Sequence, residues 1–258
     1  MRTIWLSSYP KAGNTWITSF LYYYYFGIPE HSSEIMLKIP DIHELLGKKQ
    51  MLNEDSPDTI MCKSHFLFSD KHPQIHSTSG FIYLLRHPKD ILLSDLSFWK
   101  LCHPETRIDD YRFAISFIEN DGNLAWSELG FGSWPQHVSS WFHAFEKYPG
   151  LQIRYEDLMK DPQEFRKIIQ FLSNDGVDEA RFKIAINASS FQSMRNMEIQ
   201  EKQESIKDTI FPGGESSLKS EKYFVNKGGV GQSLAHIGSD LDEMFDNKYA
   251  EILSQLGY

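Results

Sequence analysis

Short apolar runs alternate with stretches of helical periodicity along most of the chain. The runs occupy residues 4–6, 59–62, 81–85 and 151–155. They are continuous rather than interleaved with polar residues, which predicts strands buried on both faces of a parallel sheet. Helical patterns follow from Thr15, from Pro88 or Lys89, and from Asp161 to about Leu172. Strands that alternate with helices predict an α/β fold, a single domain with a central parallel β-sheet flanked by helices.

Two later segments have other patterns. Residues 198–222 are polar and contain Phe-Pro-Gly-Gly at 211–214. This favours a long mobile loop, a lid over a site. Residues 240–256 have the pattern of an amphipathic helix. The most apolar run, 17–28, is about half the length needed to span a bilayer. We therefore expect one domain over residues 1–258 and no membrane partner.

Composition excludes some classes of function. Lys and Arg number 26 against 35 Asp and Glu, a net charge of −9. This balance disfavours a protein that coats nucleic acid, although a few clustered cations could still bind a small anion. The two cysteines, Cys62 and Cys102, make no disulfide framework, and the N-terminus has no signal-peptide pattern. Both features favour a cytoplasmic location.

The loop at residues 9–16 follows a strand and opens a helix. The N-terminus of a helix attracts anions, and here Lys11 adds a charge, Gly13 lets the backbone approach a ligand, and Thr15 adds a hydroxyl. The loop is P-loop-like but lacks the Walker order, because its lysine precedes the glycine, so metal-dependent triphosphate chemistry is disfavoured. The alternative for the loop alone is an ordinary turn.

Two more segments carry anion-binding features. Arg86 ends the clearest strand, at the sheet edge where α/β proteins bind ligands, and Ser94 lies in the following helix. Residues 226–231, Asn-Lys-Gly-Gly-Val-Gly, are typical of a backbone nest around an anion. Taken singly, Arg86 could simply pair with Asp90, and glycine-rich turns are common. The three segments together are more specific.

With these motifs the chain resembles the cytosolic-type sulfotransferases, which transfer a sulfuryl group from 3′-phosphoadenosine 5′-phosphosulfate (PAPS). Residues 9–16 resemble the family's 5′-phosphosulfate loop, 86–94 its 3′-phosphate motif, 226–231 its closing Arg-Lys-Gly segment, and 63–65 its Lys-Thr-His stretch. The family's arginine is replaced by Asn226. The opening and compact length look closest to bacterial members.

The resemblance implies in-line transfer with His65 as general base, Lys11 and Lys63 stabilising charge, and Ser94 controlling Lys11. It implies no metal, and adenosine 3′,5′-bisphosphate (PAP) as the product. The cofactor-binding residues that it implies are Lys11, Ala12, Gly13, Asn14, Thr15, Trp16, Arg86, Ser94, Tyr155, Ser189, Phe191, Asn226, Lys227 and Gly228.

The expected partner is a small acceptor with a hydroxyl, or an amine. Aromatic residues are frequent in the expected pocket walls at 16–25, after His65, at 101–131 and at 198–222, which favours a hydrophobic or phenolic acceptor. Two other functions stay open. They are a P-loop small-molecule kinase, which would need magnesium, and a non-catalytic nucleotide-binding protein. The oligomeric state is open as well.

Overall fold

A computed structural model describes residues 2–52, 59–173, 175–211 and 222–258. Four parallel strands form one sheet in the order β2-β1-β3-β4. The strands are β1 (Arg2–Ser7), β2 (Thr59–Ser64), β3 (Thr78–Leu85) and β4 (Gly150–Arg154). All four predicted strands are confirmed, and three of them are longer than their apolar runs. Tyr155, expected at the end of the last strand, instead begins a helix.

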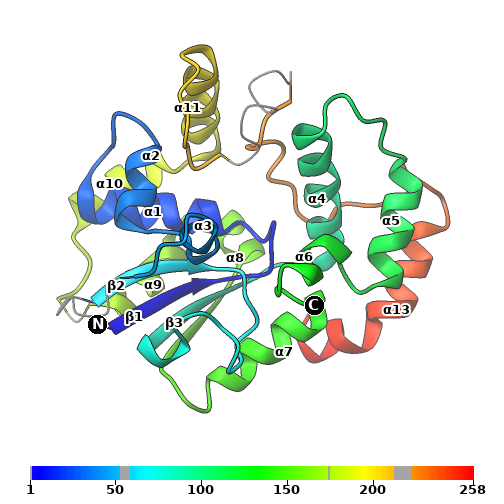
Figure 1. Cartoon of the computed structure of the whole chain (residues 1–258), viewed down its shortest axis with the longest axis horizontal. Helices are drawn as coiled ribbons and strands as arrows, with labels where there is room; N and C mark the ends of the chain where they lie inside the picture. The colour runs from blue at the N-terminus through cyan, green and yellow to red at the C-terminus, as the bar shows by residue number, and fades with distance from the viewer. Residues whose placement is uncertain (1, 53–58, 174, 212–221) are drawn as a thin grey trace.

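Helices lie on both faces of the sheet, as Figure 1 shows. They are α1 (Asn14–Phe26), α2 (Ser33–Lys38), α3 (Ile42–Gly47), α4 (Pro88–Cys102), α5 (Asp110–Glu119), α6 (Leu124–Glu128), α7 (Trp134–Ala144), α8 (Tyr155–Lys160), α9 (Phe165–Leu172), α10 (Glu179–Ala188), α11 (Phe191–Gln203) and α13 (Leu241–Gln255), with 3₁₀ turns η1 (Ile75–Ser77) and η2 (Pro162–Glu164). The predicted α/β class, a parallel sheet flanked by helices, is confirmed.

Alternate residues of β3 enter two separate hydrophobic clusters. Phe81 and Tyr83 pack with α7 and α13, while Ile82 and Leu84 pack with α1, α9 and α10. Side chains of a strand point alternately to the two faces of its sheet, so a continuous apolar run supplies both clusters. This double burial fixes the carboxyl ends of β1, β2 and β3, from which the loops discussed below emerge.

The predicted lid at 198–222 is wrong in its first part. Residues 198–203 form the last turns of α11. Their buried polar side chains are Glu198 and Glu201, which accept hydrogen bonds from Val225 N (2.8 Å) and Ser32 Oγ (2.8 Å), respectively. The low hydropathy of residues 198–203 therefore does not indicate a solvated loop. These residues are helical, and their buried carboxylates form hydrogen bonds with other segments. Residues 212–221 of the expected lid lie outside the described residues.

The other predicted helices match the structure closely. The helix expected at 240–256 is α13 (Leu241–Gln255), and the one expected from Asp161 is η2 followed by α9. Asp161 caps it as predicted, because its carboxylate accepts the N–H of Gln163 at 2.9 Å. Within the described part of the chain, no helix is long and apolar enough to cross a membrane.

Candidate active site

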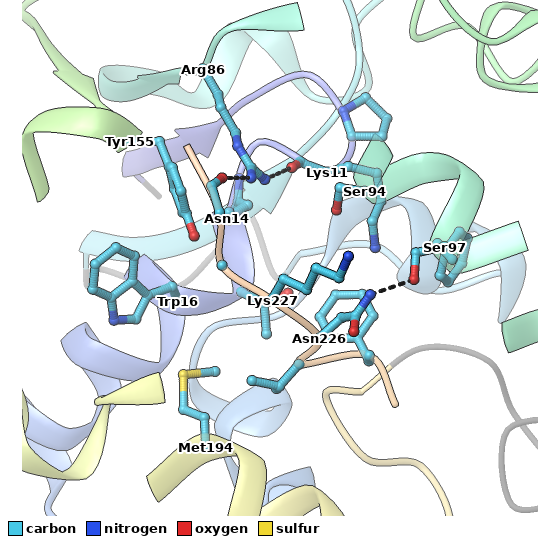
Figure 2. Close-up of a pocket in the computed structure, with 18 of the residues that line it drawn as sticks. Lys11, Asn14, Trp16, Arg86, Ser94, Ser97, Tyr155, Met194, Asn226 and Lys227 are labelled. Carbon is cyan, nitrogen blue, oxygen red and sulfur yellow. Dashed lines mark hydrogen bonds between the residues drawn. The ribbon is translucent and has the colours of Figure 1, made fainter. Parts of the chain in front are cut away.

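A cavity of about 930 Å³ opens at the carboxyl ends of the strands and collects the predicted motifs. The predicted residues that line it are Lys11, Gly13, Asn14, Thr15, Trp16, Lys63, His65, Arg86, Ser94, Tyr155, Ser189, Phe191, Asn226, Lys227 and Gly228. Ala12 is the exception, since its side chain is buried in the core behind the loop. Figure 2 shows Arg86, Lys11 and Lys227 converging from three segments that are far apart in the sequence.

The loop between β1 and α1 is shaped by Gly13. Its φ of 105° lies in the left-handed region, and a Cβ there would come within 2.6 Å of the Tyr155 ring. Among the described residues, no side chain caps the N-terminus of α1. Asn14 instead turns inward and donates to the carbonyl of Leu6 at 2.8 Å. The loop thus leaves the helix N-terminus open to an anion, while Asn14 holds the loop to β1.

Arg86 ties two of the anion-binding segments together. Its guanidinium donates to the carbonyls of Lys11 (2.8 Å) and Gly229 (2.9 Å) and lies 4.1 Å from the centre of the Tyr155 ring (Figure 2). Arg86 is 5% exposed, and its buried Nε has no hydrogen-bond partner among the described residues. A buried donor without a partner costs stability, so its presence beside the cavity points to a ligand.

The glycine-rich segment is anchored to α4. The carboxylate of Asp90 accepts the N–H groups of Gly231 (2.9 Å) and Gln232 (3.0 Å). Asn226 donates to Ser97 Oγ at 2.7 Å (Figure 2). Asp90 bonds to this loop, and Arg86 bonds to the carbonyls of Lys11 and Gly229. The suggestion that Arg86 pairs with Asp90 is therefore wrong.

Lys11 lies at the bottom of the site with a left-handed backbone, φ 68°. Burial lowers the pKa of its ammonium to about 7, and the nearby Lys63 and Arg86 charges add to this, whereas Asp95 opposes it. Asp95 is itself fully buried on α4 and accepts from Trp126 Nε1 at 3.1 Å. Burial raises the pKa of the Asp95 carboxyl to about 6. Sequence reasoning missed Asp95.

His65 is held in one orientation. Its Nδ1 donates to the carbonyl of Ser8 at 2.7 Å, and His137 Nε2 lies 3.1 Å from the His65 carbonyl. Burial, with Lys63 nearby, lowers the pKa of His65 to about 3. The sequence argument relied on titration near neutral pH, and the structure corrects this. The imidazole is therefore neutral throughout the physiological range.

Lys63 is paired rather than free. Its ammonium lies 2.8 Å from the carboxylate of Asp41, the residue that caps α3. Burial alone raises the pKa of Asp41, but Lys63 and His65 bring it below its ordinary value. Sequence reasoning missed Asp41 because 41 and 63 meet only through the fold.

Different groups of aromatic side chains line two sides of the cavity. On one side Trp16 meets Tyr155 edge to face at 5.6 Å, and the 44% exposed Phe191 ring lies beside Gly228. Figure 2 places Trp16, Tyr155 and Met194 on this side. Ser189 Oγ already donates to the carbonyl of Ala185 at 2.7 Å.

On the other side, stacked rings lead to His65. Phe98 stacks on Trp126 at 5.9 Å, Trp126 on Phe131 at 6.1 Å, and Phe131 lies 5.8 Å from His65. Only some of the residues predicted to form the pocket walls line this cavity. Trp126 and Phe131 line the cavity, but Tyr22 to Tyr25 do not. Polar lining that was not predicted comes from Asp41, His43, Glu44 and Lys100.

Over residues 2–52, 59–173, 175–211 and 222–258, no three His, Cys, Asp or Glu side chains come together as a possible metal site.

Comparison with known proteins identifies the family. Residues 1–257 match the family described as "Sulfotransferase domain". Bovine sulfotransferase 1E1 is 30% identical over 262 residues, 95% of this chain and 81% of that protein. Rat sulfotransferase 1A1 is 30% identical over 203 residues, 74% of this chain and 66% of that protein. These relatives are mammalian and lend no support to the expected likeness to bacterial members.

Solved structures agree on the fold. Retinol dehydratase in complex with retinol and PAP superposes with a TM-score of 0.71 at 16% identity, covering 98% of this chain and 82% of that one. Mouse sulfotransferase SULT7A1 with PAP gives a TM-score of 0.65 at 22% identity, covering 98% and 84%. The chain therefore belongs to the sulfotransferase family and is an enzyme of the sulfotransferase class.

Proposed function

We propose that this sulfotransferase takes its sulfuryl group from PAPS and transfers it to a hydroxyl of a small aromatic acceptor. The observation that carries the proposal is the convergence of Lys11, Arg86 and Lys227 with the neutral His65 on one cavity. Two of the structural relatives are described as bound to PAP, and the chain's own residues fit such a ligand. PAPS supplies the sulfuryl group and a phosphate leaving group.

The fit is seen in two places. The Tyr155 ring leaves no room for a side chain at Gly13, and the adjacent N-terminus of α1, with no side-chain cap among the described residues, can hold the 5′-phosphate through its backbone N–H groups. The unpartnered Nε of Arg86 suits the 3′-phosphate, together with Ser94, Lys227 and the backbone of Gly228. Trp16, Tyr155 and Phe191 offer ring faces and edges to adenine. Ala12 supports the loop from the core, and Asn226 is already bound to Ser97.

The acid–base step falls to His65. Because Nδ1 donates to a carbonyl, which can only accept, the lone pair of the neutral ring is on Nε2. His65 takes the acceptor's proton there as the oxygen attacks sulfur. Lys11 stabilises the negative charge that grows on the leaving oxygen. Lys63, which pairs with Asp41, lowers the pKa of His65. Its positive charge also helps to stabilise the sulfuryl group during transfer.

The acceptor side supports a flat ring as substrate. Phe98, Trp126 and Phe131 form a stacked wall that ends at His65. Aromatic pairs gain from offset stacking beyond the area they bury, so this wall favours a phenol over an aliphatic amine. A cytoplasmic location is also proposed, supported by two free cysteines, one of them buried.

Calorimetric titration with PAP, ATP and NADPH, without added metal, tests the donor. We expect PAP alone to bind, and turnover of PAPS with a phenol panel without magnesium. Stronger binding of ATP, or turnover that needs magnesium, would favour the kinase alternative. PAP binding without transfer to any phenol, alcohol or amine would favour a non-catalytic nucleotide-binding protein.

A further inference from the structure

The ammonium of Lys11 lies between two phenyl rings. Its Nζ is 4.2 Å from the centre of the Phe98 ring and 3.9 Å from the centre of the Phe224 ring. The two rings meet edge to face, with centres 6.3 Å apart. Among the described residues, Lys11 Nζ donates no hydrogen bond and forms no ion pair within 4 Å. The rings are therefore its nearest partners.

We propose that Phe98 and Phe224 form a cage that holds the Lys11 ammonium in the nucleotide-free protein, and that the donor nucleotide must draw Lys11 out of it. Both rings are then positioning residues for Lys11. The inference rests on the role proposed above for Lys11. A ring face attracts a cation, most strongly where water is excluded, and an ammonium enclosed by two rings has little room left for an anion.

The cage is built from two independent parts of the fold. Phe98 projects from α4, where it stacks on Trp126 of the acceptor wall. Phe224 lies in the segment that leads to the glycine-rich loop, and α11 fixes it there. Glu198, 2% exposed, accepts the N–H groups of both Phe224 (2.5 Å) and Val225 (2.8 Å). These contacts hold the backbone of Phe224 and one face of the Phe98 ring beside Lys11.

The cage affects nucleotide binding in a predictable direction. If Lys11 occupies the cage in most molecules, only the remaining molecules can bind PAP without first moving it. The apparent affinity for PAP is then the intrinsic affinity multiplied by the fraction of molecules in which Lys11 is free. Removing one ring raises that fraction and should tighten PAP binding. Damage to the fold, or loss of a direct contact with the nucleotide, would weaken binding instead. The sign of the effect therefore separates a cage from ordinary packing.

The test compares Phe98→Leu and Phe224→Leu, each in the parent and in a Lys11→Met background, by calorimetric titration with PAP. We expect each change to lower the Kd about fivefold in the parent, and to leave it within twofold in the Lys11→Met background. Phe68→Leu, a half-buried ring outside the cavity, is the matched control and should not alter the Kd. Unchanged or weaker binding in both backgrounds overturns the cage.

A second readout detects the cage in the free protein, before any ligand is added. In protein labelled with ¹³C-lysine, the Cε–Hε signal of Lys11, assigned with Lys11→Met, should be shifted upfield by the two rings. Either leucine variant should reduce this shift, and saturating PAP should remove it. An unshifted Lys11 signal in the free protein overturns the cage, whatever the protein binds. A shifted signal with no PAP binding would support the cage and contradict the proposed donor.

Discussion

His65 donates its Nδ1 proton to the carbonyl oxygen of Ser8 across 2.7 Å. Ser8 directly follows β1 and His65 directly follows β2, and the two strands pair in parallel register. The sheet itself therefore fixes the tautomer of His65 and leaves the ring's lone pair on Nε2. This bond explains how the half-buried imidazole at the cavity wall can be a fixed hydrogen-bond acceptor without a carboxylate partner.

Replacing His65 by Asn should separate chemistry from binding. The Asn amide can still donate toward the Ser8 carbonyl, but it offers no base. We expect turnover to fall about 10²- to 10⁴-fold, with the Kd for PAP within twofold of the parent. Steady-state rates and titration calorimetry measure the two effects. A fully active His65→Asn enzyme would mean that another group accepts the proton.

Substituting Gly13 by Ala should impair the nucleotide site. The new Cβ meets the Tyr155 ring at 2.6 Å, and the φ of 105° is strained for any other residue. Since Tyr155 also packs on Arg86, its displacement disturbs the 3′-phosphate site. We expect a tenfold or greater loss of PAP affinity, on the order of 1.4 kcal/mol. Gly27→Ala is the control. Its φ of 91° brings the same backbone strain, but no atom lies within 4 Å, so stability should fall without a change in the Kd.

The sequence predicted the sheet and the three segments that line the cavity, because each depends on local signals. An apolar run marks a strand, and a glycine or an arginine just after it marks the sheet edge. It could not predict the pairing of Lys63 with Asp41 or the place of Phe98 and Phe224 around Lys11, because these meet only in three dimensions. The end of α11 was misread since hydropathy cannot distinguish a solvated carboxylate from one that binds backbone N–H groups, as Glu198 does.

Glu198→Gln should weaken nucleotide binding. The carboxylate accepts two N–H groups at the start of the segment that carries Lys227, and a neutral amide accepts less well and brings N–H donors of its own. We expect the KM for PAPS to rise several-fold with a smaller change in kcat. Glu201→Gln is the matched control on the same helix. It anchors Ser32 instead, so it should lower the melting temperature without raising that KM.

Acid should destabilise the protein through its buried histidines. Burial lowers the pKa of His65 and His137 to about 3 and that of His72 to about 4. The unfolded chain binds these protons near pH 6.5 and the folded chain does not, so stability falls as the pH drops below 6.5. At pH 5 the loss is about 2 kcal/mol for each ring. Asp95, whose pKa is raised to about 6, offsets about 1 kcal/mol.

Urea unfolding at pH 7, 6 and 5 measures this slope. In His72→Gln, where an amide can still bond to Ser64 Oγ, the loss between pH 7 and pH 5 should shrink by about two-fifths. Equal slopes for the parent and this variant would show that His72 does not contribute to the acid sensitivity.

Binding of PAP should take up a proton at Lys11. The free protein holds this ammonium at a pKa of about 7, and a bound anion raises that value by Coulomb attraction. Below pH 7 Lys11 is charged before and after binding, so its contribution to affinity is constant there. Above pH 7 the free lysine is neutral and must be protonated on binding, so affinity falls as the pH rises.

At pH 8 the expected uptake is about 0.9 proton, and the Kd should rise about tenfold per pH unit from there. Calorimetry in buffers of different ionisation enthalpy at pH 8 and 9, where the phosphates of PAP are almost fully ionised, measures both. The groups around Lys11 are Asp95 and Cys102 on α4, Lys63 on β2 and Arg86 after β3. The Lys11→Met variant leaves them in place, so it should bind PAP with no uptake near pH 8. Uptake that persists in that variant would assign the proton to one of those neighbours.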